Sequence, residues 1–97
     1  MDFTAYPLRV GTVAEAEVAD GALRLVVDLG GGDRRTTTAH ITERYTPEAV
    51  IGRQVAVVLD PPGAVQGEVV VLAAVSPEYG AVLLRPDADV PDGTAIV

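Results

Sequence analysis

The stretch Arg34–Val55 reads RRTTTAHITERYTPEAVIGRQV and predicts a strand, a short helix and the start of a further strand. The run Arg35–Thr42 is rich in threonine, which favours a strand. Helix signals follow at Thr46–Glu48: threonine can cap the helix, proline suits its first position, and glutamate lies at the positive end of the helix dipole. Gly52 is placed to end the helix in the left-handed conformation. We expect about one helical turn and then a strand over Arg53–Leu59.

Two strands precede this stretch and are predicted to form a hairpin. Every second residue from Leu8 to Val18 is apolar or small, which is the pattern of a half-buried strand. Asp20-Gly21 supplies a tight turn. The loop Gly30–Asp33 lacks the GK[ST] and the helix that would follow in a phosphate-binding loop, so we interpret it as a hairpin connection. The strand between these turns is Ala22–Leu29, with inward residues Leu23, Leu25, Val27 and Leu29.

Further strands are expected after the helix. Besides Arg53–Leu59 they are Glu68–Val75, Ala81–Arg85 and a last short strand, Thr94–Val97. An all-β chain with a helix after its third strand predicts an oligonucleotide-binding, Greek-key barrel (an OB-fold) with extra terminal strands. A chain of 97 residues is expected to form a single domain over residues 1–97.

The expected fourth and fifth strands are apolar on both faces, as the runs Val55–Leu59 and Val69–Val75 illustrate. A barrel buries only one face of each strand, so the other face needs cover from the helix, the terminal strands or a partner. No segment is long enough to provide all of this cover, and we therefore expect a homodimer. The residues predicted for the dimer interface are Val69, Val71, Ala73 and Phe3.

The residue inventory argues against catalysis and metal binding. The chain contains no cysteine, lysine or asparagine, one histidine, His40, and one serine, Ser76. A cysteine or lysine nucleophile is excluded, and a serine–histidine pair would require these two single residues to meet. One histidine with scattered carboxylates is a poor basis for a zinc site. We expect a non-enzyme with no catalytic residues, no metal and no cofactor.

The beginning of the chain and its apolar runs favour a cytoplasmic location. The segment Met1–Val10 lacks the basic run and apolar core of a signal peptide. The apolar runs are far shorter than the roughly 20 residues that a membrane-spanning helix needs. A chain without cysteine also suits a reducing compartment. We expect a soluble, cytoplasmic protein with no membrane partner.

The formal net charge of −7 is distributed unevenly. Asp33–Arg53 carries four arginines against three carboxylates, 4 − 3 = +1, whereas the remaining residues carry three arginines against eleven carboxylates, 3 − 11 = −8. Such an acidic chain is a poor match for strong, non-specific nucleic-acid binding, which needs a basic face to neutralise phosphates. Any anion-binding function is therefore expected in Asp33–Arg53.

A set of short motifs runs through the whole chain in order. The most specific block is Ile51–Val55, IGRQV, and it is preceded by Ala39–Thr42, AHIT. Supporting blocks are Leu8–Gly11, Glu68–Leu72, Leu83–Asp87 and Val90–Gly93. Together these motifs resemble the tRNA-binding-domain family, and most closely its short bacterial CsaA branch.

This resemblance implies an oligonucleotide-binding barrel, a homodimer, no catalysis, and binding of structured RNA such as tRNA. The CsaA branch is also credited with a chaperone role in protein export, which implies an unfolded or export-bound polypeptide as an alternative partner. Basic residues that are common in the family are replaced here by Ala19–Gly21 and Gly63–Val65. We therefore expect weak, salt-sensitive RNA binding; the alternative is a protein-binding dimer with little RNA affinity.

Four residues of the third strand and the loop before it are candidates for RNA contact. Arg34 and Arg35 can donate charge-assisted bonds to phosphate, or they can be the solvated end of a hairpin. Thr38 and His40 share the outward parity of a strand that carries ligands in this fold, although a polar exterior face is the alternative.

Arg53 completes the candidate set. It can contact RNA, or it can pair with Glu48 or Glu43 and hold the helix in place. Tyr45 can stack on a base, which contributes about 1–3 kcal/mol per base, but packing at the edge of the barrel is the favoured interpretation.

Overall fold

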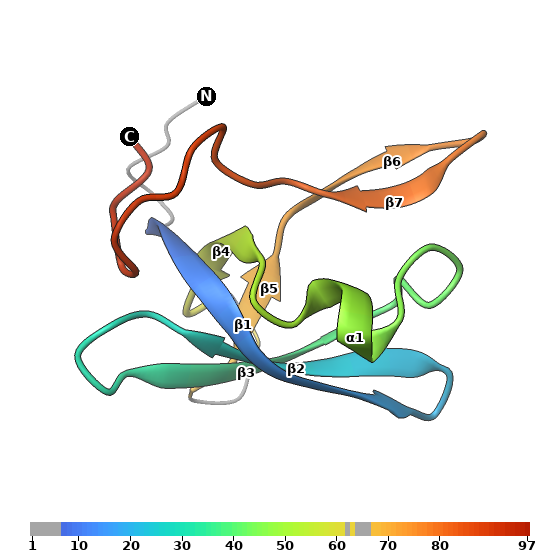
Figure 1. Cartoon of the computed structure of the whole chain (residues 1–97), viewed down its shortest axis with the longest axis horizontal. Coiled ribbons are helices and arrows are strands. Elements are labelled where there is room, and N and C mark those ends of the chain that lie inside the picture. The colour runs from blue at the N-terminus through green and yellow to red at the C-terminus, as the bar shows by residue number, and fades with distance from the viewer. Residues whose placement is uncertain (1–6, 62, 64–66) are drawn as a thin grey trace.

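The fold is a barrel of five antiparallel strands with one short helix and a separate two-stranded ribbon (Figure 1). The computed structural model describes residues 7–61, 63 and 67–97. In that part of the chain, no helix has the length and apolar character that crossing a membrane requires. The barrel strands pair in the order β3-β2-β1-β4-β5, and β6 pairs with β7. The elements are β1 (Leu8–Ala19), β2 (Ala22–Asp28), β3 (Arg34–Ala39), α1 (Pro47–Val50), β4 (Gln54–Leu59), β5 (Val69–Val71), β6 (Ala73–Ser76) and β7 (Gly80–Leu83).

The barrel closes where β3 approaches β5. Thr36 and Glu68 form an isolated parallel bridge, and the Thr36 N–H donates to the Gly67 carbonyl oxygen at 3.3 Å. The successive pairs within the sheet are antiparallel. The result is an almost all-β, nearly closed barrel with its helix after the third strand, which confirms the predicted oligonucleotide-binding architecture.

The hairpin of β1 and β2 forms as predicted. Asp20 and Gly21 have φ angles of 52° and 77°, and this left-handed pair joins Ala19 to Ala22, which lie opposite each other. All four residues predicted to point inward are buried. They form the core together with Val13, Ile41, Tyr45, Val50, Val55, Val57 and Val69.

The alternation predicted for the first strand is wrong at its centre. The register between β1 and β2 shifts between Val13 and Glu15, so that Ala14 is an extra residue. Val13 is fully buried, although the predicted pattern assigned Thr12 and Ala14 to the buried face. Such a bulge reverses the parity that faces the core, and Ala16 packs against the core beyond it. Parity within a single strand could not reveal this bulge.

The third strand is shorter than the predicted Arg35–Thr42. It ends at Ala39, because the chain turns at Ile41. The Ile41 carbonyl oxygen accepts hydrogen bonds from the N–H groups of Arg44 and Tyr45 at 3.2 and 3.0 Å. Ile41 itself is 4% exposed, so burial of its side chain holds this turn against the barrel.

The helix α1 is a single turn, Pro47–Val50, as predicted. Thr46 occupies the N-cap position in an extended conformation, but its hydroxyl makes no capping hydrogen bond, so the predicted side-chain cap is wrong. Gly52 has a φ of +89°, which confirms the left-handed residue after the helix. The Gly52 N–H donates to the Val13 carbonyl oxygen at 2.8 Å and ties the end of the helix to β1.

Gly52→Val is expected to lower the free energy of unfolding by about 1–2 kcal/mol. A β-carbon at Gly52 would meet no atom within 4 Å, so the whole cost arises from the positive φ. Gly52→Asn should recover part of the loss, because asparagine tolerates left-handed backbone. Urea unfolding of the three proteins measures these differences. A valine variant as stable as the parent would contradict this account of the helix end.

The predicted strand Glu68–Val75 is divided into β5 and β6, which belong to different sheets. Leu72 lies between them: its N–H donates to the Ala56 carbonyl oxygen at 2.9 Å, and its own carbonyl oxygen accepts from the Leu84 N–H at 3.1 Å. After Leu72 the chain leaves the barrel and pairs with β7, and Figure 1 shows the resulting ribbon extending away from the barrel. The continuous apolar run conceals this change of sheet.

The C-terminal segment lies along β1 without forming a strand. The predicted strand Thr94–Val97 is reduced to an isolated bridge between Ala95 and Arg9. The Val10 N–H also donates to the Thr94 carbonyl oxygen at 2.9 Å. The pairing of β1 with β2 starts only at Thr12. The C-terminal segment occupies the edge of β1 before that residue.

The second face of β4 is covered within the chain. Val55 and Val57 are fully buried in the core, and Ala56, which points to the other face, is only 8% exposed. The cover predicted to come partly from within the chain is thus present at Ala56, while Val58 on the same face is half-buried. The outer face is more exposed on β5, where Val69 is buried and Val70 is 45% exposed.

Candidate nucleic-acid interface

Arg34, at the start of β3, lies among acidic side chains. Its Nη1 is 3.7 Å from Glu15 Oε2, and its Nε is 3.8 Å from Asp28 Oδ2. The side chain is half exposed, and each such pair in water contributes about 0–1 kcal/mol to stability. The two carboxylates nevertheless offset the positive charge, so a phosphate would have to compete with them for Arg34.

Arg35 is held more tightly than Arg34. Its Nε donates to Asp33 Oδ1 at 2.8 Å and its Nη2 donates to Asp33 Oδ2 at 3.4 Å, while Nη1 lies 3.5 Å from Asp60 Oδ1. The hydrogen bond to Asp33 raises the pKa of Arg35 above its ordinary value. Most donors of this guanidinium are therefore used within the protein, which leaves few for phosphate.

The exposed threonines of β3 lie over a shallow hollow. Thr36 and Thr38 are exposed and Thr37 is buried, as the alternation predicts, whereas exposed His40 lies one residue beyond the end of the strand. The hollow measures about 350 Å³, and its charged lining residues are Glu68 and Arg24, whose guanidinium lies 3.5 Å from a Glu17 carboxylate oxygen. The two carboxylates offset the charge of this arginine, so the predicted face offers hydroxyl groups but no excess positive charge.

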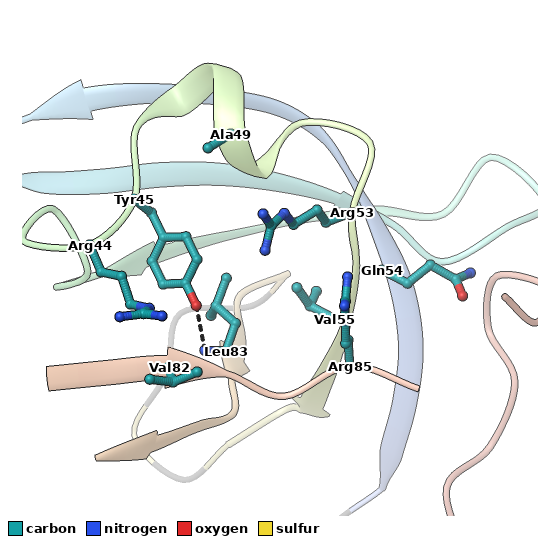
Figure 2. Close-up of a pocket in the computed structure, with 9 residues that line it drawn as sticks. All are labelled: Arg44, Tyr45, Ala49, Arg53, Gln54, Val55, Val82, Leu83 and Arg85. Carbon is teal, nitrogen blue, oxygen red and sulfur yellow. Dashed lines mark hydrogen bonds between the residues drawn. The ribbon is translucent and has the colours of Figure 1, made fainter. Parts of the chain in front are cut away.

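Three other arginines line a second pocket, which we call the arginine pocket. Arg44 precedes α1, Arg53 follows the helix, and Arg85 follows β7. The pocket has a volume of about 440 Å³. Figure 2 shows Arg44 and Arg53 reaching toward Tyr45 from opposite sides. The apolar residues of the lining are Ala49, Val55, Val82 and Leu83.

Tyr45 is a structural part of the arginine pocket. It is 8% exposed, and its hydroxyl oxygen accepts a hydrogen bond from the Leu83 N–H at 3.0 Å (Figure 2). The guanidinium carbon of Arg53 lies 5.8 Å from the centre of the tyrosine ring, a cation–π distance. The ring is therefore covered by protein. This supports the predicted packing role of Tyr45 over stacking on a base.

The arginines of the pocket differ from those of β3 in their electrostatic surroundings. Among the described residues, no carboxylate oxygen lies within 4 Å of a guanidinium nitrogen of Arg44, Arg53 or Arg85. The pairing of Arg53 with Glu43 or Glu48, one of the two predicted roles, is thus not formed. Three positive charges around one concave surface create a positive potential in an otherwise acidic protein.

A second hollow of about 450 Å³ adjoins the arginine pocket and shares Arg53, Gln54 and Arg85 with it. Asp87 and Asp89 are among its lining residues. Their negative charges disfavour an anion in that direction. The part of the surface that suits an anion is therefore the side formed by α1 and β7.

Gln54 has a structural role. Its Nε2 donates to the Val90 carbonyl oxygen at 2.6 Å, and its Oε1 accepts from the Val90 N–H at 3.0 Å. Asp92 Oδ1 in turn accepts from the Thr12 hydroxyl at 2.6 Å. These bonds attach the C-terminal segment to β4 and β1. Within the IGRQV block, the glutamine thus supports the fold while Arg53 lines the pocket.

Sequence reasoning selected Arg53 but missed Arg44 and Arg85. Both lie in regions that had already been singled out: Arg44 in Arg34–Val55, and Arg85 in the block Leu83–Asp87. The missing information was that the chain before α1 and the chain after β7 meet at one pocket. A tertiary contact between segments so far apart has no local sequence signal.

The residues predicted for the dimer interface occupy different environments. Val69 is 3% exposed and belongs to the core, while Val71 and Ala73 are half-buried. Phe3 lies outside the described residues. The large apolar side chains that are exposed in this region are Val70, Val75, Tyr79 and Leu84.

The chemistry available at this interface is that of guanidinium groups. Arginine donates paired hydrogen bonds to phosphate or carboxylate and keeps its charge at all physiological pH values. The described residues contain no group of three or more histidine, aspartate or glutamate side chains placed to hold a metal ion. The site therefore suits the binding of an anion.

A nearly closed five-stranded barrel with a basic pocket defines a protein of the oligonucleotide-binding barrel class. The model of one family, described as "Putative tRNA binding domain", matches residues 8–95. This chain belongs to that family, as its motifs indicated.

The sequence is similar to part of several methionine–tRNA ligases. It is 46% identical over 101 residues to the ligase of Methanothrix thermoacetophila and 36% identical over 102 residues to that of Methanococcoides burtonii. These matches include 97% and 98% of this chain. The chain spans only 15% of the length of either ligase.

Solved structures of similar length have the same fold. The chaperone CsaA from Bacillus anthracis superposes with a TM-score of 0.88 at 38% identity, covering 99% of this chain and 94% of that one. The CsaA chaperone protein from Picrophilus torridus gives a TM-score of 0.82 at 30% identity, covering 99% and 95%. The similarity thus extends over nearly the full length of both proteins.

Proposed function

We propose that this chain is a non-catalytic, homodimeric domain of the cytoplasm that binds tRNA or other structured RNA weakly and in a salt-sensitive manner. The observation that carries this proposal is the arginine pocket. Arg44, Arg53 and Arg85 line it without a carboxylate partner among the described residues. Membership of the tRNA-binding-domain family supports phosphate as the anion.

Weak binding follows from the charge balance. Seven arginines face fourteen carboxylates, so the approaching RNA is repelled by most of the surface. Of the predicted contacts, Arg53 lines the arginine pocket, whereas Arg34 and Arg35 are engaged with acidic residues. Thr38 and His40 can add hydrogen bonds but no permanent charge. We therefore assign the main phosphate contacts to the arginine pocket and a secondary role to the β3 face.

Titration of labelled tRNA at about 20, 50 and 150 mM salt tests the proposed function. If about three phosphates are neutralised, the slope of log affinity against log salt should lie near −2 to −3. Fluorescence anisotropy provides both affinity and slope. Absence of binding at the lowest salt, or binding that does not change with salt, would refute the assignment.

The dimer is expected to form through β5 and the β6–β7 ribbon. Ala81 and Leu83 attach the β6–β7 ribbon to the core, but its far end exposes Val75 at 81% and Tyr79 at 62%. Light scattering after size exclusion at micromolar concentration should give a dimer mass. Val75→Asp should produce monomers, whereas Val18→Asp, which changes an equally apolar exposed residue on the β1–β2 hairpin, should not. A monomer mass for the unmodified protein would contradict the proposal.

The second candidate function is that of a chaperone-like dimer that binds polypeptide, and the exposed apolar side chains of Val18 and Ile51, which lie outside the expected dimer surface, favour it. Similarity to the two CsaA structures, both of proteins described as chaperones, supports the same function. Suppression of the aggregation of a thermally unfolding client protein tests it. Activity in this assay together with absence of tRNA binding would establish the chaperone-like function in place of RNA binding.

A further inference from the structure

The arginine pocket combines charge with an apolar wall. Three guanidinium groups share the lining with Ala49, Val55, Val82 and Leu83. A site that only attracts a polyanion needs no such wall, because charge alone provides that attraction. The composition of the lining therefore suits a ligand whose anionic group lies next to a flat or apolar group.

The dimensions of the pocket restrict the form of RNA that can enter it. Its volume of about 440 Å³ is within the range of about 300–1,000 Å³ that sites for small ligands occupy. The backbone of a double helix is convex and can touch only the rim of such a hollow. An unpaired nucleotide can turn its base and phosphate inward together, and single-stranded ends and loops are the parts of RNA whose bases are accessible.

The three arginines are suited to different contacts. The guanidinium of Arg53 lies over Tyr45, which restrains it at the wall of the pocket. Among the described residues, the guanidinium groups of Arg44 and Arg85 have neither a hydrogen-bonded partner nor an ion pair. Their donors are available to an incoming phosphate. The carboxylates of Asp87 and Asp89 on the adjoining hollow direct that phosphate toward the α1 side.

We propose that the arginine pocket receives one unpaired nucleotide of the bound RNA. Arg44 and Arg85 hold its phosphate, Arg53 adds positive charge from its position over Tyr45, and the base packs against the wall that contains Ala49 and Val82. This inference rests on the proposed RNA-binding function and adds to it the structural element that is recognised. It assigns the pocket to single-stranded ends or loops, as opposed to helical stems.

Two RNA hairpins with the same stem test the proposal. One hairpin ends bluntly, and the other carries a short single-stranded 3′ extension. The extension should raise affinity about tenfold, the equivalent of one charge-assisted hydrogen bond. Arg85→Gln should abolish this gain, and so should Ala49→Glu, which adds a carboxylate at an exposed helical position. The gain should persist in Arg24→Gln, which removes one positive charge on β2.

The outcomes separate this inference from the proposed function. Equal affinity for both hairpins, with tRNA still bound, would overturn the inference and leave RNA binding intact. A gain that survives in both Arg85→Gln and Ala49→Glu would place the unpaired nucleotide elsewhere and also overturn it. Displacement of RNA by an acidic peptide, but not by a nucleoside monophosphate, would assign the pocket to carboxylates. Failure to bind either hairpin or tRNA would refute the proposed function itself.

Discussion

Gly11→Val is expected to lower the free energy of unfolding by about 3 kcal/mol, because the added side chain has no space. A β-carbon at Gly11 would lie 2.5 Å from Val27 Cγ1 and 2.9 Å from both the Asp28 carbonyl oxygen and Leu29 Cδ2. Two of these neighbours belong to the buried core and one is backbone, so none can move away cheaply. For a domain of this size, the melting temperature should fall by more than about 10 °C.

A comparison with Gly52 separates the two reasons for which this chain uses glycine. Gly11 does not have a positive φ and is crowded, whereas Gly52 has a φ of +89° and open space around the missing side chain. Asparagine should therefore be better tolerated than valine at Gly52, but both should be strongly destabilising at Gly11. Denaturant unfolding of the four variants measures this pattern. A stable Gly11→Val variant would show that β1 can move away from the end of β2.

Arg44→Gln/Arg85→Gln is expected to reduce tRNA affinity by about 100-fold at low salt, because charge-assisted hydrogen bonds contribute at least about 1.5 kcal/mol each and the variant removes two of them. The salt slope should also become shallower by about 1 for each phosphate contact that is lost. Both arginines lack carboxylate partners among the described residues, so their charge is available to RNA. Anisotropy titrations over the same salt range provide both quantities.

Arg34→Gln/Arg35→Gln is the matched control, since it removes the same charge from β3. The four carboxylates that now offset these arginines would be left unpaired and would repel RNA over a distance. Salt screens such repulsion beyond about 8 Å at physiological ionic strength, so at about 150 mM this variant should lose no more than about threefold. If the β3 variant lost more tRNA affinity than the pocket variant, the main phosphate contacts would lie on β3 and not in the arginine pocket.

The local sequence was sufficient for the elements whose determinants lie within a few residues. The turn at Asp20-Gly21, the inward leucines and valines of Ala22–Leu29 and the left-handed Gly52 were all predicted correctly. Each depends on the φ preference of one residue or on the period of a strand, and neither requires knowledge of distant segments. The order of such elements, with the helix after the third strand, also predicted the barrel, and short motifs such as IGRQV indicated the family.

Only the tertiary structure revealed the positions at which the strand patterns are interrupted. Val13 and Ala16 both face the core although they differ in parity, because a bulge at Ala14 shifts the register of β1 against β2. The run Glu68–Val75 changes sheet at Leu72, which hydrogen-bonds to residues on two other segments. An apolar pattern predicts that a residue is buried, but it does not predict which segment of the chain covers it.

The same reason explains the candidate site. Sequence composition located the basic residues correctly, and the stretch Arg34–Val55 does contain two arginines of the pocket, Arg44 and Arg53. It could not distinguish them from Arg34 and Arg35, because a charge is neutralised or left available by groups that are close in space. Folding brings Arg85 to the pocket and Asp60 to Arg35, and only these long-range contacts decide which arginines remain available to an anion.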